Sequence, residues 1–148
     1  MIAYVDSSVI ARALLGDEEG SEDAQRLLAN RGIAKYTGRW TRIEVSAAIV
    51  RAARGGRRVV EAATLRQLDD TLHHEGGGIK VLSEPAELVE ARALAIAREH
   101  GLRALDALHL ALAAIAIPKL ADKGEPLGFA SRDGDQATVA GSLGFESV

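Results

Sequence analysis

Cysteine is absent from this 148-residue chain, and its absence excludes several kinds of site at once. A disulfide scaffold, a thiol nucleophile, a thiolate zinc site and an iron–sulfur cluster all need cysteine. Aromatic residues make up only 3% of the sequence, which argues against a module that binds single strands by stacking several bases on aromatic side chains. The lack of cysteine fits the reducing cytoplasm, where we expect the protein to act.

Long apolar runs are also missing. No segment approaches the roughly 18 uncharged residues that a membrane span needs, and the first residues lack the basic start of a secretory signal. We therefore expect a soluble, unprocessed chain with no membrane partner. The net charge is -3, so we do not expect a protein that coats nucleic acid non-specifically.

The chain does have enough apolar material for one buried core. Apolar residues make up 47% of it and charged residues 26%, which predicts a single folded domain over residues 1–148. Arginine outnumbers lysine. Phosphate contacts by guanidinium groups and a GC-rich genome both explain that bias, and the composition alone does not choose between them.

Short apolar segments of β-forming residues alternate with segments of helical apolar spacing along the whole chain. The expected strands are residues 1–5, 33–36, 79–82, 127–130 and the edge segment 145–148. The expected helices are 7–15, 21–30, 41–54, 57–74, 83–100, 105–117, apolar on nearly every side and ended by Pro118, and 136–143. The alternation predicts an α/β fold with a central, mainly parallel sheet of four to five short strands, flanked by about seven helices in an α/β/α arrangement.

Several acidic residues follow expected strands or begin expected helices. Open parallel sheets bind ligands beyond the carboxyl ends of their strands, so these side chains can face one cleft. They are Asp6, Glu44, Asp106 and Asp133.

Each of these acids, taken alone, also has a structural explanation. Asp6 could cap the helix that follows it, and Glu44 stands three residues after a threonine, which is the capping-box spacing. Asp133 could be an ordinary turn or cap residue. Asp106 would enter an apolar helix, where a carboxylate is costly unless it is paired, capped or bound to a metal. The conjunction of the four favours a functional site.

Clustered carboxylates repel one another, so protons or a cation must neutralise them. Oxygen ligands without a neighbouring histidine pair or cysteine indicate Mg²⁺ or Mn²⁺ instead of zinc. Such a site supports attack of an activated water molecule on a phosphodiester.

Four segments carry these acids: Tyr-Val-Asp-Ser-Ser at 4–8, Thr-Arg-Ile-Glu at 41–44, Leu-Asp-Ala-Leu-His-Leu-Ala at 105–111 and Phe-Ala-Ser-Arg-Asp at 129–133. In that order they resemble the four motifs of PIN-domain ribonucleases, most closely those of the VapC toxins of bacterial toxin–antitoxin pairs. The resemblance implies a PIN-like nuclease domain over residues 1–148 that uses Mg²⁺ or Mn²⁺ to cut RNA internally. It further implies tRNA or ribosomal RNA as substrate, a homodimer, and a cognate VapB-like antitoxin that inserts a peptide into the active-site groove.

The resemblance also assigns roles to individual residues. It implies that Asp6, Glu44, Asp106 and Asp133 are the catalytic, metal-binding acids, and that Ser131, in a place usually held by threonine, supports the metal site together with Ser7. Because RNA is a polyanion, nearby cations must offset the acids, and we hypothesise that Arg12, Arg39 and Arg42 line the phosphate path; a purely solvated role is the alternative for each. His109 falls on the same helix face as Asp106, where a core or supporting imidazole is favoured over a metal ligand.

The competing functional interpretation is a non-catalytic PIN-fold module that binds RNA or protein. Response-regulator receivers need an acidic pair after the first strand, and dehalogenase-type phosphatases need a second aspartate at position 8, where Ser8 stands. The phosphate-binding and nucleophile motifs GxxxxGK[ST], GxGxxG and GxSxG are absent. Retention of all four acids favours the catalytic interpretation.

Overall fold

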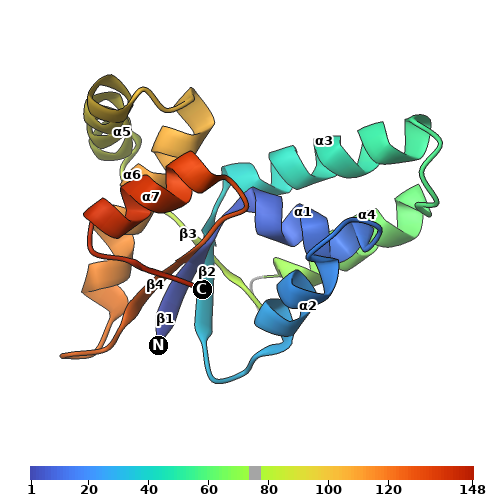
Figure 1. Ribbon diagram of the computed structural model, residues 1–148, viewed down its shortest axis with the longest axis horizontal. Coiled ribbons are helices and arrows are strands. Elements are labelled where there is room, and N and C mark those ends of the chain that lie inside the picture. The colour runs from blue at the N-terminus through green and yellow to red at the C-terminus, as the bar shows by residue number, and fades with distance from the viewer. Residues whose placement is uncertain (74–77) are drawn as a thin grey trace.

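A five-stranded parallel sheet forms the centre of the protein in a computed structural model that describes residues 1–73 and 78–148 (Figure 1). The strand order is β3-β2-β1-β4-β5, and every neighbouring pair is parallel. The strands are β1 (Ile2–Val5), β2 (Ala34–Gly38), β3 (Lys80–Leu82), β4 (Leu127–Ala130) and β5 (Glu146–Ser147). Because β1 lies between β2 and β4, its carboxyl end is at the centre of one edge of the sheet.

Helices cover both faces of the sheet, which confirms the α/β/α prediction. They are α1 (Ser7–Leu15), α2 (Ser21–Ala29), α3 (Trp40–Arg54), α4 (Glu61–Thr71), α5 (Ala86–His100), α6 (Ala104–Leu120) and α7 (Gly134–Ser142). Figure 1 shows α5, α6 and α7 on one side of the sheet and α1 to α4 on the other.

The side-chain alternation of β1 supplies a core to each face. Ile2 and Tyr4 pack into the core formed with α5, α6 and α7, and Val5 packs into the core formed with α1 to α4. This follows from the two-residue period of a strand, whose successive side chains point to opposite faces. The α6 helix is buried along most of its length, as its apolar sequence predicts.

Several boundaries differ from the sequence-based prediction. The helix expected over 57–74 is Glu61–Thr71, since residues 57–60 are not helical, and its expected end at His74 lies outside the described residues. The α6 helix continues past Pro118 to Leu120, so the proline does not end it. A proline removes one backbone donor. In the last turn of α6 the helix tolerates that loss and ends two residues later, at Leu120.

The expected fourth strand is confirmed residue for residue, and the other strands within one or two residues. Among the described residues, no helix is both long enough and apolar enough to cross a membrane.

Candidate active site

Asp6 lies directly beyond the carboxyl end of β1 and is 4% exposed. Its Oδ2 accepts a 2.9 Å hydrogen bond from the backbone N–H of Ser8, so it is the N-cap of α1. The cap explanation of Asp6 is therefore correct, but it uses only one of two carboxylate oxygens. Oδ1 lies 3.7 Å from Nε2 of His109, within the cluster of ionisable groups described below. Asp6 thus caps a helix with one oxygen and faces the cluster of ionisable groups with the other.

Asp106 lies in the first turn of α6, three residues after the N-cap Arg103, so it does not cap the helix. Burial raises the pKa of its carboxyl, and the negative charges of Asp6 and Asp133 raise it further, although Arg103 and His109 oppose the shift. Raised pKa values of this kind arise where like charges gather. Asp106 is therefore within electrostatic reach of Asp6, which follows β1, and of Asp133, which follows β4.

Asp133 begins α7, where its Oδ1 accepts a 2.9 Å hydrogen bond from the backbone N–H of Gln136. Ser131 supports this turn because its Oγ accepts from the backbone N–H of Asp133 over 3.0 Å. Ser131 therefore contacts the backbone of the fourth acid, and its expected role at a metal site stays a prediction. Ser7 is the first residue of α1, and the contact to this turn comes from Ser8, whose Oγ accepts from the backbone N–H of Arg132 at 3.1 Å.

Glu44 lies in the second turn of α3, and its capping-box explanation is wrong. The helix begins at Trp40 with Arg39 as N-cap, and no side chain caps it. Thr41 is buried inside the first turn, where its hydroxyl bonds the hydroxyl of Thr37 at 2.7 Å. Glu44 Oε2 instead lies 2.6 Å from Nε2 of His109.

His109 joins Glu44 to the other acids. The side chain is 1% exposed, and its Nδ1 lies 2.7 Å from the hydroxyl of Tyr4 on β1. Burial alone would lower the pKa of His109, but the hydrogen bond with Glu44 and the charges of Asp6, Glu44 and Asp106 outweigh burial, so the pKa is raised. The prediction of a buried, supporting imidazole agrees with this placement.

Gln136 is a site residue that sequence analysis missed. It is fully buried, and its Nε2 lies 3.4 Å from Asp6 Oδ1 and 3.3 Å from the backbone oxygen of Asp106, both of which accept. Its Oε1 accepts a 2.6 Å bond from the hydroxyl of Ser131. The sequence offers only a weak signal, an uncharged polar side chain in the first turn of a helix that follows Asp133.

The donor set fits a hard divalent cation. All four acids offer oxygen ligands, and the charges of Asp6 and Asp133, which add to burial in raising the pKa of Asp106, are charges that a cation would offset. Within residues 1–73 and 78–148, no three His, Asp or Glu side chains are already arranged around one metal position. Mg²⁺ usually binds through one or two carboxylates and several waters, so two of these acids are sufficient as direct ligands.

The three arginines of the expected phosphate path already have neighbours. Arg12 forms a 3.1 Å ion pair with Glu18, and Arg42 lies 3.6 Å from Asp69. The guanidinium of Arg39 lies over the ring of Trp40, 5.3 Å from its centroid. Surface pairs of this kind are weak and exchange readily, so RNA binding by these side chains stays a prediction.

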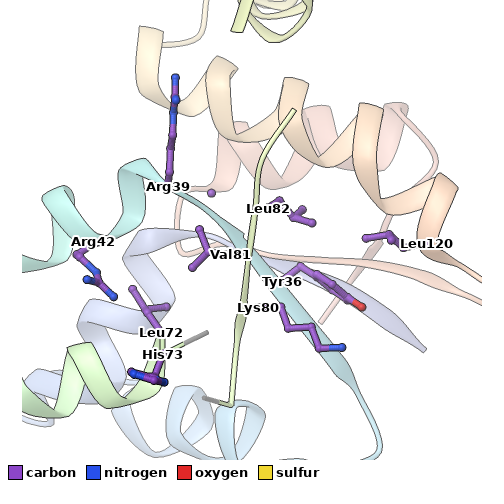
Figure 2. A pocket seen from close by; sticks show the side chains of 10 residues that line it. Tyr36, Arg39, Arg42, Leu72, His73, Lys80, Val81, Leu82 and Leu120 are labelled. Carbon is purple, nitrogen blue, oxygen red and sulfur yellow. The ribbon is translucent and has the colours of Figure 1, made fainter. Parts of the chain in front are cut away.

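A cavity of about 750 Å³ lies along the edge strand β3 (Figure 2). Its walls include Tyr36, Leu72, Leu82 and Leu120. Figure 2 shows that the cationic side chains Arg39, Arg42 and Lys80 project from its rim in different directions. None of the four acids lines it, so the chemistry is assigned to the edge of the sheet where the acids gather.

Comparison with known proteins agrees with this architecture. A family model described as the PIN domain matches residues 3–141. No curated protein sequence gives a significant match.

Among solved structures, the fold is similar to one described as "Crystal structure of VapBC2 from Rickettsia felis bound to a DNA fragment from their promoter". The match has a TM-score of 0.63 and 13% identity, and it covers 99% of this chain and 98% of that chain. At this identity the likeness shows a shared fold. The match of the family model over nearly the whole chain shows more: this protein belongs to the PIN domain family.

Proposed function

We propose that this chain is a metal-dependent endoribonuclease of the VapC type, which hydrolyses RNA phosphodiester bonds and acts as the toxin of a toxin–antitoxin pair. The observation that carries the proposal is that Gln136, on the helix that Asp133 caps, contacts both the Asp6 carboxylate and the backbone oxygen of Asp106, so that three acids from separate parts of the chain lie at one place. Carboxylates held together despite their repulsion are typical of functional sites. Membership of the PIN domain family supports the same conclusion.

Asp6, Glu44, Asp106 and Asp133 are the residues that we propose to hold Mg²⁺ or Mn²⁺. When bound, such a cation supplies positive charge that helps to ionise water and stabilises the charge that develops on a phosphodiester. The chain contributes the fixed positions of the acids. Asp6 is held by the α1 cap and by Gln136, and Asp133 by the α7 cap. Carboxylates fixed in this way would hold a bound cation in one position, which lowers the entropic part of the barrier.

In the proposed reaction, water adds to phosphorus and the bond from phosphorus to the leaving ribose oxygen breaks. The products are a phosphate monoester and a free hydroxyl, so no oxidant or second substrate is needed. We propose that Arg12, Arg39 and Arg42 bind backbone phosphates on either side of the cleaved bond. Their charges offset the repulsion between RNA and the acids.

We also propose the partners that a VapC-type toxin implies: a second copy of the chain, and a VapB-like antitoxin that blocks the acids. The similar Rickettsia felis structure is described as VapBC2, which supports an antitoxin partner. On this proposal the protein acts in the cytoplasm, where tRNA and ribosomal RNA are the proposed substrates.

A non-catalytic PIN-fold module that binds RNA or protein is the second candidate. The observation in its favour is that no metal-binding group of three side chains is already arranged among the described residues. The two candidates differ in the effect of a metal. A catalytic protein is stabilised by Mn²⁺ and cleaves RNA, and a binding module does neither.

The experiment is cleavage of total tRNA and ribosomal RNA by the purified chain, with Mg²⁺, with Mn²⁺ and with EDTA. We expect discrete fragments that depend on the metal and that disappear in Asp106→Asn. A control variant, Asp122→Asn, replaces an exposed acid in the loop before β4 and should cleave normally. Cleavage that persists in EDTA or in Asp106→Asn would contradict the proposal.

A further inference from the structure

We propose that His109 is the positioning residue for Glu44: its buried imidazole fixes the Glu44 carboxylate at the acidic site, and Tyr4 fixes the imidazole in turn. The inference rests on the proposed function and adds to it an assignment for two side chains outside the four acids. It concerns the hydrogen-bonded geometry of the chain itself.

A continuous series of short contacts connects β1 to α3 through α6. The Tyr4 hydroxyl lies 2.7 Å from Nδ1 of His109, and Nε2 of His109 lies 2.6 Å from Oε2 of Glu44. A carboxylate can only accept, so Nε2 carries the proton in this contact. When the ring is neutral, Nδ1 is then the acceptor, and the Tyr4 hydroxyl is the donor that it faces.

The imidazole is held in place by rings as well as by hydrogen bonds. Trp40 meets it edge to face, with centroids 6.3 Å apart and an interplanar angle of 82°. Tyr4 meets it at 5.8 Å and 65°. Tyr4 itself is fully buried and stacks on Phe129 of β4, with centroids 5.4 Å apart. The orientation of His109 is therefore set by the core of the protein.

Glu44 needs such an anchor more than the two acids that cap helices do. Asp6 and Asp133 have short side chains and are fixed as helix caps. Glu44 has one more rotatable bond, is about a quarter exposed, and projects from the second turn of α3. Without His109, its carboxylate would gain freedom to turn into solvent. Pinning one oxygen by His109 leaves the other oxygen and the remaining lone pairs for a ligand.

Asp106 and His109 lie on the same helix, so that one helix positions two of the acids, Asp106 and Glu44. They are three residues apart on α6 and therefore lie on the same face. The same helix thus presents the Asp106 carboxylate directly and the Glu44 carboxylate through His109. Residues that orient a metal-binding side chain in this way typically contribute about 10- to 100-fold in metal affinity or activity.

The experiment measures Mn²⁺ affinity by calorimetry, and kcat and KM on RNA, in the intact chain. We expect His109→Leu to weaken Mn²⁺ binding about 10- to 100-fold. The conservative change His109→Gln, whose amide can donate near the position of Nε2, should recover most of that loss. Ile117→Val, a core change two turns further along α6, is the control and should leave the affinity unchanged.

A double-mutant cycle separates positioning from general packing. In the Glu44→Gln background, His109→Leu should have little further effect on Mn²⁺ affinity, because the group it orients is already altered. An equal loss in both backgrounds, or full affinity in His109→Leu, would overturn the inference. If His109→Leu does not fold, Tyr4→Phe is the second variant, because it removes the hydroxyl that contacts Nδ1 and leaves the ring in place. Tyr4→Phe should weaken Mn²⁺ binding by less than the roughly 10- to 100-fold expected for His109→Leu. An unchanged Mn²⁺ affinity in Tyr4→Phe would overturn the inference.

Failure of the proposed function gives a different result. A wild-type chain that neither binds Mn²⁺ nor cleaves RNA rejects the nuclease proposal, and the positioning inference falls with it. A wild-type chain that does both, with a His109→Leu variant that matches it, rejects the positioning inference alone.

Discussion

Gln136 and Asp6, 130 positions apart in the chain, are joined by a 3.4 Å hydrogen bond from Nε2 to Oδ1. The same amide group contacts the backbone oxygen of Asp106 at 3.3 Å, so one buried side chain on α7 connects the carboxyl end of β1 to the start of α6. Asp6 and the backbone of Asp106 are thus connected by a neutral, buried amide group. This arrangement leads to predictions about stability as well as catalysis.

Replacing Gln136 with leucine should destabilise the protein. The change leaves the hydroxyl of Ser131 and an oxygen of Asp6 without their partner, and an unsatisfied buried polar group costs about 1–3 kcal/mol. Urea unfolding should show the loss. The control is Thr138→Val on the same helix, whose exposed hydroxyl bonds the backbone of Gly134, and it should change stability by about 0.5 kcal/mol or less. Equal stability of Gln136→Leu and wild type would contradict the bonding described here.

Asp106→Asn should stabilise the metal-free protein at neutral pH. The pKa of Asp106 is raised in the folded state, so the folded protein holds this proton more tightly than the unfolded chain does. The stability this proton gives is fully present below the unfolded pKa and is lost as pH rises through the folded pKa. Asparagine carries no charge at any pH, so its advantage should be present at pH 7 and vanish in acid. Thermal unfolding from pH 3 to 7 in EDTA measures it, and a variant less stable than wild type at pH 7 would contradict it.

Asp6→Asn and Asp6→Ala should differ in stability, and neither should cleave RNA. Asparagine can still cap α1 by accepting from the backbone of Ser8, whereas alanine cannot, at a cost of about 0.5–2 kcal/mol. Both variants lose the negative charge that we propose to hold the metal, so neither should cleave RNA. Chemical unfolding and the RNA assay measure the two properties separately. Cleavage by Asp6→Asn at the wild-type rate would show that Asp6 is not a catalytic acid.

Mn²⁺ should raise the melting temperature of the wild-type chain. A ligand that binds only the folded state stabilises it by about 2.7 kcal/mol at a concentration 100 times its dissociation constant. The increase should be absent in Asp6→Asn and should be reversed by EDTA. Potassium chloride at equal ionic strength controls for the general effect of salt. An equal increase in Asp6→Asn would assign the bound ion to another part of the surface.

Arg39→Ala and Arg42→Ala should each weaken RNA binding and lower its dependence on salt. A side chain that contacts one phosphate contributes about one unit to the slope of log K against log salt. The control is Arg31→Ala, because Arg31 is exposed in the turn that leads into the amino end of β2, at the opposite edge of the sheet. Filter binding with catalytically inactive Asp106→Asn measures affinity without cleavage. Unchanged slopes would place both arginines outside the phosphate path.

The class of fold was predictable because it depends on local patterns. Apolar runs such as 127–130 and the apolar helix that contains Asp106 have one stable arrangement, in which a buried parallel sheet is covered on both faces. The ends of helices were less predictable. Pro118 lies inside α6 and Thr41 inside α3, because packing against the core compensates for a lost hydrogen bond or an unused cap.

The sequence by itself determined that Asp6, which follows β1, and Asp133, which follows β4, lie along one edge of the sheet, since residues that follow parallel strands share that edge. Only the tertiary structure decided how they are held. Asp6 and Asp133 cap helices while they face the site, Glu44 bonds His109, and Gln136 reaches two acids from beneath. These contacts join residues up to 130 positions apart, and no periodicity or spacing in a sequence encodes the rotamer of a side chain that is fixed by distant neighbours.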